Sequence, residues 1–218
     1  MLHYLQELFY ALDFSSLWDA VGRVIAIFLC LTVHETCHGL AAYALGDPTA
    51  KSMHRLSLNP LRHIDWIGLL MMFAVGFGWA KPVPVDPRYF KKPKQGMALT
   101  ALAGPVSNLL LAAAALALLR GAVLVLPGTN WAIWLVNFLL ELSVLSVGLG
   151  LFNLIPIPPL DGSKVLAAFL PDRAYVTLMR YERYGILVLL VLSFLNLGSI
   201  SISRAIYAVW SALYSLFF

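Results

Sequence analysis

The chain has 218 residues, of which 61% are hydrophobic and only 12% are charged. Its mean hydropathy is +0.82, and soluble domains carry roughly 25% charged residues, so the composition excludes an ordinary soluble domain and predicts a polytopic membrane protein. The net charge of +4 comes from basic residues in connecting segments without interleaved aromatic residues, which argues against a nucleic-acid partner.

The first predicted span is Val24–Leu45, since about 20 mostly apolar residues suffice to cross a bilayer. The residues before it lack the features of a cleavable signal peptide, so we expect the amino terminus to remain on the protein. The span contains two cysteines, Cys30 and Cys37, for which buried free thiols are expected, and the ionisable group His34, Glu35 and His38.

The next apolar segment, residues 66–79, has only 14 residues and is flanked by basic connections on both sides. Basic loops tend to remain on the cytoplasmic side, so both flanks are expected on one side of the membrane. This arrangement predicts a re-entrant segment, and the proline-rich stretch 81–94 that follows predicts an extended loop.

Further spans are predicted at Met97–Leu119, Trp131–Ile157 and Gly185 to about Ser203. Residues 204–218 form either a final short span or an interfacial helix. We therefore expect an all-α polytopic membrane protein with about four to six apolar helices and a re-entrant or extended segment between the first and second full spans. Residues 1–218 are interpreted as a single domain, with a core at 24–170 and C-terminal membrane helices at 184–218.

The basic loops also predict the orientation of the chain in the cell membrane. The uncharged connection at 126–130 fits the outer face, and basic residues from Lys164 to Arg183 return the chain to the cytoplasmic side. The ionisable group of the first span is then expected in its cytoplasmic half. Glu141, about ten residues into its span, has no partner that the sequence identifies.

The pattern His34-Glu35-x-x-His38 has the spacing of a helical metal site. Residues at i and i+4 share a helix face, so both imidazoles can reach one zinc ion while Glu35 faces the open coordination position as general base. The pattern is short, and core or interfacial histidines are the alternative. Three ionisable residues inside one span favour function.

Asp161 is the best candidate for a third ligand. Three prolines at 156–159 and Gly162, which permits an unusual backbone angle, predict an unwound chain that lets the carboxylate turn inward. A helix N-cap at the start of residues 162–170 is an equally good explanation of this aspartate. Spacing does not decide between the two. His54 and His63, in a loop, are left out of the ligand set.

Three motifs occur in the order found in the site-2 protease family of intramembrane zinc metalloproteases: HETCH at 34–38, ALAGPVSNLLLA at 101–112 and NLIPIPPLDG at 153–162. Over roughly residues 24–170 the chain resembles the compact prokaryotic branch of that family, without PDZ or CBS domains. The resemblance implies one Zn²⁺ per chain, bound by His34, His38 and Asp161, with Glu35 as catalytic base. Thr36 and Cys37 depart from the family, which more often has apolar residues there.

Two asparagines in apolar surroundings are secondary candidates. Interhelical hydrogen bonding is the structural interpretation of Asn108 and Asn153, and the family motifs suggest positioning of substrate or of the developing oxyanion. Packing is favoured for Asn108 and function for Asn153. Gly104-Pro105 is expected to mark either a close helix approach or a break where its span begins.

The expected function is hydrolysis of peptide bonds in or near transmembrane segments of membrane-protein substrates. A helical substrate must unwind locally, and an extended edge between His54 and Val85 is the expected place for it to pair as a strand. Two alternatives are a non-catalytic membrane metal-binding protein, against which Glu35 argues, and a metal transporter, which would need more than one ligand set. The sequence does not indicate the substrate or the oligomeric state.

Overall fold

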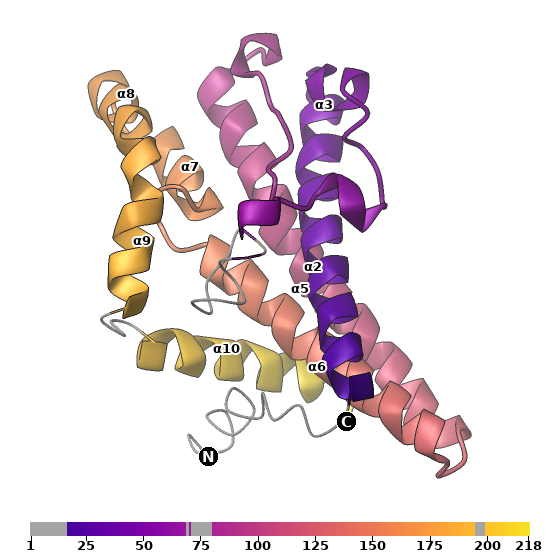
Figure 1. Ribbon diagram of the computed structural model, residues 1–218. Coiled ribbons are helices and arrows are strands. Elements are labelled where there is room, and N and C mark those ends of the chain that lie inside the picture. Colours follow the sequence, from indigo (N-terminus) through magenta and orange to yellow (C-terminus); the bar gives the residue numbers. More distant parts are fainter. Residues whose placement is uncertain (1–16, 69, 71–79, 195–198) are drawn as a thin grey trace.

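The computed structural model describes residues 17–68, 70, 80–194 and 199–218 (Figure 1). All regular elements in those ranges are helical, which confirms the all-α expectation. Three helices are long and apolar enough to cross a membrane: α2 (Leu17–Ala44), α5 (Pro93–Val125) and α6 (Asn130–Asn153). The shorter elements are α3 (Thr49–Ser52), η1 (Pro60–Arg62), η2 (Pro87–Tyr89), α7 (Asp161–Ala168), α8 (Asp172–Tyr181), η3 (Glu182–Tyr184), α9 (Gly185–Phe194) and α10 (Ser199–Tyr214).

The three long helices pack against one another around small side chains. Ala26 and Cys30 of α2, Ala115 of α5 and Leu142 of α6 form one buried cluster. Small residues let helix backbones approach closely, which favours association where lipid offers no hydrophobic gain. Large apolar side chains on the outer faces, such as Leu29 and Leu110, are exposed. The bundle therefore has the apolar exterior expected in a bilayer.

Glu141, for which the sequence offered no partner, forms an ion pair with Arg23. The carboxylate lies on α6 and the guanidinium on α2, and their side chains are only 27% and 25% exposed. Charges inside a span are costly, so each group offsets the cost of placing the other in the bundle. The contact also links two of the three long helices far from the histidines of α2.

Helix α10 packs against α6 (Figure 1). Ile206 packs in a buried cluster with Ala112 of α5 and Val147 of α6, and Trp210 Nε1 donates a hydrogen bond of 2.9 Å to Ser143 Oγ. The fourth predicted span begins as α9, but residues 195–198 lie outside the described part, and Ser199 already belongs to α10. The number of spans beyond three stays a prediction.

The connection between α2 and α5 folds back onto the end of α2. Arg55 donates hydrogen bonds to the carbonyls of Lys81 and Pro82, and buried Asp47 accepts one from the Asp86 N–H at 2.7 Å. These contacts hold residues 80–86, which form neither helix nor strand, as the prolines predict. The extended loop predicted over 81–94 is nevertheless interrupted by η2 and ends at Pro93, where α5 begins. The re-entrant prediction for 66–79 concerns residues of which only 66–68 and 70 are described, so it remains untested.

Candidate metal centre

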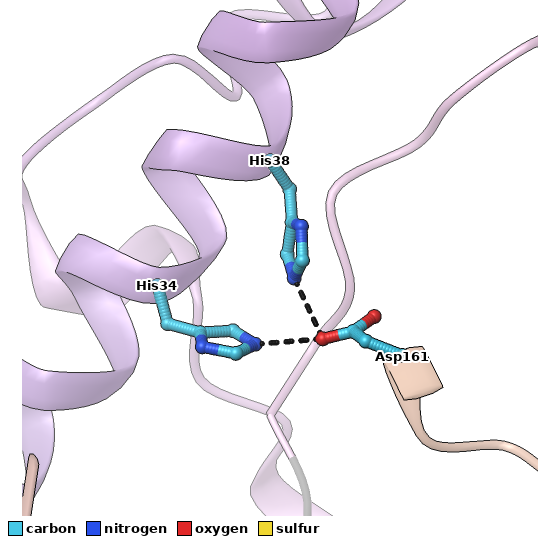
Figure 2. A group of neighbouring side chains, drawn as sticks. All are labelled: His34, His38 and Asp161. Carbon is cyan, nitrogen blue, oxygen red and sulfur yellow. Dashed lines mark hydrogen bonds and ion pairs between the residues drawn. The ribbon is translucent and has the colours of Figure 1, made fainter. Parts of the chain in front are cut away.

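His34 and His38 lie on one face of α2, as their spacing predicts, and both point toward Asp161 (Figure 2). The distance from Asp161 Oδ2 is 3.1 Å to His34 Nε2 and 3.0 Å to His38 Nε2. All three residues are buried. Residues separated by more than 120 positions in the chain thus present three ligand atoms to one point.

Asp161 is the first residue of α7, and its side chain does not act as a helix cap. The N-cap position belongs to Leu160, which makes no side-chain cap hydrogen bond. Residues 154–160 form turns between α6 and α7, in agreement with the unwound chain predicted there. Of the two interpretations that the sequence left open, the structure favours the carboxylate directed at the histidines.

The reason predicted for Gly162 was wrong. Gly162 is helical, and Gly46 is the only glycine with positive φ in the part of the chain that the structure describes. A Cβ at Gly162 would instead collide with the main chain, at 2.7 Å from the Ile155 carbonyl oxygen and closer still to that of Leu154. The glycine is therefore needed because α7 begins directly against the turn that follows α6, which places Asp161 beside α2.

The donor set fits a divalent metal of the zinc type. Ligands held tetrahedrally at about 2.0–2.1 Å from a zinc ion lie roughly 3.3 Å apart, close to the separations between Asp161 Oδ2 and the two ring nitrogens. The ligand atoms all lie within 4.8 Å of one another. Two imidazoles and one carboxylate leave a fourth position free for a water or substrate, which is the arrangement of catalytic sites.

The charge state of Asp161 also suits a ligand. Burial alone would raise the pKa of this carboxyl, but hydrogen bonds and charge from His34 and His38 outweigh it and hold the pKa below its ordinary value. The ring nitrogens that face away from Asp161 have partners as well: the Thr100 carbonyl lies 2.7 Å from His38 Nδ1, and the Asn108 amide lies 3.3 Å from His34 Nδ1. Such outer contacts orient metal ligands.

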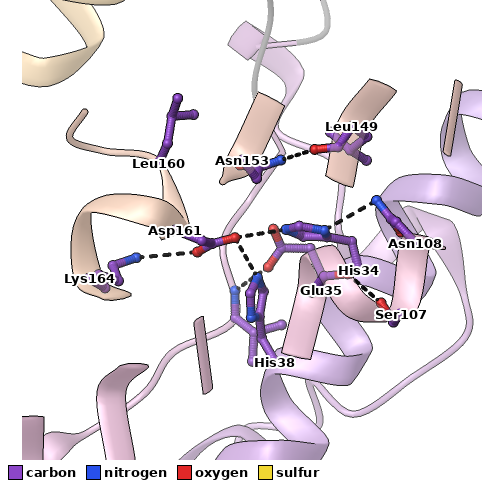
Figure 3. Close-up of polar contacts among 12 residues, drawn as sticks. His34, Glu35, His38, Ser107, Asn108, Leu149, Asn153, Leu160, Asp161 and Lys164 are labelled. Atoms are coloured by element: carbon purple, nitrogen blue, oxygen red, sulfur yellow. Dashed lines mark hydrogen bonds and ion pairs between the residues drawn. The ribbon is translucent and has the colours of Figure 1, made fainter. Parts of the chain in front are cut away.

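Glu35 lies beside the three candidate ligands (Figure 3). Its Oε2 accepts a hydrogen bond of 2.9 Å from the main-chain N–H of Val83, in the extended segment 80–86. One oxygen of this carboxylate is thereby held by the main chain. No side-chain pattern in the sequence could have indicated Val83, because the contact is made by its backbone.

The two asparagine candidates differ in whether they contact the candidate ligands. Asn153 Nδ2 donates to the carbonyl of Leu149 in its own helix at 3.0 Å, whereas Asn108 contacts a candidate ligand directly (Figure 3). Lys164 was not among the predicted site residues, but its Nζ lies 3.8 Å from Asp161 Oδ1. Its position three residues after the aspartate, on the same helix face, was the available signal.

Gly104 permits the close approach of α5 to the histidines. A Cβ at this position would lie 2.6 Å from His34 Cε1 and closer still to the His38 ring. The helix continues through Pro105, so of the two interpretations of Gly104-Pro105 the close approach applies and the break does not. The sequence motif marked the position, but only the fold shows which groups it accommodates.

Replacing Gly104 by alanine is therefore expected to displace both imidazoles and to weaken zinc binding by more than about 10-fold, the lower end of what a lost orienting contact costs. Gly121→Ala is the matched control on the same helix, because nothing lies within 4 Å of a Cβ there. Zinc affinity measured by competition with a chelating dye distinguishes the two variants. Equal affinities would contradict the packing described for Gly104.

Comparison with known proteins identifies a family profile and three relatives named as zinc metalloproteases. The profile of peptidase family M50 matches residues 119–196. The protein YwhC of Bacillus subtilis (strain 168), named as a zinc metalloprotease, is 39% identical over 192 residues, which cover 87% of this chain and 84% of YwhC. No solved structure gives a significant match.

Two mycobacterial proteins named as zinc metalloprotease Rip2 are more distant. The protein from Mycobacterium tuberculosis (strain ATCC 25618 / H37Rv) is 32% identical over 173 residues, and the one from Mycolicibacterium smegmatis (strain ATCC 700084 / mc(2)155) is 27% identical over 169. The alignments cover 76% and 75% of this chain and 63% of each relative. The extent of the match to YwhC, together with the M50 profile, shows that the chain belongs to peptidase family M50, the site-2 protease family.

Proposed function

We propose that the protein is a zinc-dependent endopeptidase that hydrolyses peptide bonds in or near the transmembrane segments of membrane proteins. The observation that carries the proposal is the convergence of His34, His38 and Asp161 beside Glu35, within a bundle whose helices can span a bilayer. The names of the relatives support zinc as the metal and proteolysis as the reaction.

His34 Nε2, His38 Nε2 and Asp161 Oδ2 would hold one zinc ion per chain. Zinc bound in this way supplies Lewis acidity, which activates water and polarises the scissile carbonyl. Glu35 supplies the base: with Oε2 held by the Val83 N–H, Oε1 takes a proton from the attacking water and passes it to the departing amine. The buried surroundings of the ligands strengthen these electrostatic effects.

The substrate is a membrane-protein segment that reaches the site in extended form. A peptide bond inside a helix is protected by its hydrogen bonds, so the segment must unwind before Glu35 can act on it. The extended residues 80–86 pass Glu35 and support pairing of the substrate along this segment. Asn153 stays a candidate for positioning the substrate. We place the site toward the cytoplasmic side of the cell membrane because of the basic loops.

Reconstitution tests this function directly. Purified protein in proteoliposomes with a transmembrane peptide is expected to produce fragments cut within or next to the apolar segment, as identified by mass spectrometry. A zinc chelator should stop the cleavage, and added Zn²⁺ should restore it. Zinc flux across the vesicles without cleavage of any membrane peptide would contradict the proposal and favour a transporter.

A further inference from the structure

The two candidate histidine ligands are oriented by different kinds of partner. His38 Nδ1 faces a main-chain carbonyl, that of Thr100, whereas His34 Nδ1 faces the side-chain amide of Asn108. We propose that Asn108 is a positioning residue for His34, whose amide fixes the ring so that Nε2 presents its lone pair to the metal. This inference rests on the proposed function, and it gives Asn108 a role toward a ligand instead of toward the substrate.

The surroundings of Asn108 hold it rigidly at this place. The residue is fully buried, and its main-chain carbonyl accepts a hydrogen bond of 2.8 Å from Ser146 Oγ on α6. Gly150 also allows close approach of α6 to this part of α5, since a Cβ at Gly150 would lie 3.1 Å from the Pro105 carbonyl oxygen. The amide is thus carried by a fixed piece of α5 between α2 and α6, as a positioning group requires.

Packing alone does not explain an amide at this position. Asn108 Oδ1 is buried and has no hydrogen-bond partner in the described part of the protein. A buried polar atom without a hydrogen-bond partner destabilises the fold, and an apolar side chain of similar shape would avoid that cost. Within the part of the chain that the structure describes, this side chain makes its polar contact with His34, so the benefit of the amide lies in that contact.

The proton on His34 explains why an amide suits the position. When the ring of His34 is neutral and its proton lies on Nε2, that proton faces the Asp161 carboxylate, which only accepts, and Nδ1 can accept from Asn108 Nδ2–H. When Nε2 gives its lone pair to a metal, the neutral ring carries its proton on Nδ1, which then needs an acceptor. If the Asn108 amide rotates by half a turn about its last side-chain torsion, Oδ1, an acceptor, takes the place of Nδ2 beside His34 Nδ1.

Asn108 can therefore support His34 in both proton arrangements. An aspartate at position 108 could only accept hydrogen bonds, so it would support the His34 ring only in the metal-binding form, with the proton on Nδ1. Leucine would fill a similar volume and support neither arrangement. This difference separates positioning from packing, because leucine is a good packing residue and aspartate is a poor one.

The test measures Zn²⁺ affinity of the purified protein in detergent, by competition with a chelating dye. Asn108→Leu is expected to weaken zinc binding about 10–100-fold, the usual effect of losing an outer partner of a metal ligand. Asn108→Asp is expected to bind zinc at least as tightly as the unmodified protein. Ser107→Ala is the control, because its hydroxyl donates to the carbonyl of Gly104 in its own helix and faces no ligand in the contacts described.

Wild-type affinity in Asn108→Leu would overturn the inference, and so would equal losses in the leucine and aspartate variants. If the leucine variant fails to fold, the aspartate variant still decides, because a loss of affinity there contradicts the role of acceptor. A different result would contradict the proposed function itself: His38→Ala would then leave zinc binding unchanged, whatever the affinities of the Asn108 variants.

Discussion

Replacing Glu35 by glutamine is expected to reduce peptide-bond cleavage by about 10²–10⁴-fold, the range that general acid–base catalysis contributes. Glutamine has nearly the same shape and can still accept the Val83 N–H, but it cannot take a proton from water. Zinc binding should remain, because Glu35 is not among the three converging ligand atoms. Cleavage of a reconstituted transmembrane peptide and zinc content, measured on the same preparation, check both parts.

Glu141→Gln is the matched control for this result. It makes the same chemical change in another long helix of the bundle, where the carboxylate pairs with Arg23 and not with the site. Cleavage per folded molecule should therefore be retained in the control. A Glu35→Gln variant that cleaves as fast as the unmodified protein would rule out Glu35 as the base and favour a structural or regulatory metal site.

The helical fold could be predicted because its determinants are local. Long apolar runs must satisfy their backbone hydrogen bonds internally when they cross a bilayer, so α2, α5 and α6 were predictable from composition and length. Their ends were less predictable: the span predicted to reach Ile157 ends at Asn153, where the proline-rich turn begins. Arg23 fell outside the span predicted from Val24, so the sequence could not suggest it as the partner of Glu141.

The candidate site was predictable where side chains carry the signal. His34 and His38 share a helix face by periodicity alone, while Asp161 needed the family resemblance, because a helix N-cap was an equally good local explanation. The sequence could not predict that the Val83 N–H contacts Glu35, that the Thr100 carbonyl contacts His38, or that Gly104 leaves space for both imidazoles. The first two are contacts made by backbone atoms, and the third is the absence of a side chain where two helices meet.

Asp161→Ala is expected to have the largest effect on the metal. Removing the carboxylate leaves two imidazoles, so zinc affinity should fall by more than the roughly 10–100-fold that a lost outer partner costs. Asp172→Ala is the matched control, because Asp172 begins α8 as Asp161 begins α7 but is an exposed residue paired with Lys94. The control should bind zinc like the unmodified protein.

The zinc content per chain tests the central claim most directly, namely that the first long helix and the turn after α6 together form one metal site. Purified wild type, Asp161→Ala, His38→Ala and Asp172→Ala would be dialysed against the same weak chelator and measured by atomic absorption. We expect about one zinc per chain in wild type and in Asp172→Ala, since the three ligand atoms form a single site, and little zinc in the other two. Unchanged zinc in Asp161→Ala would contradict the account.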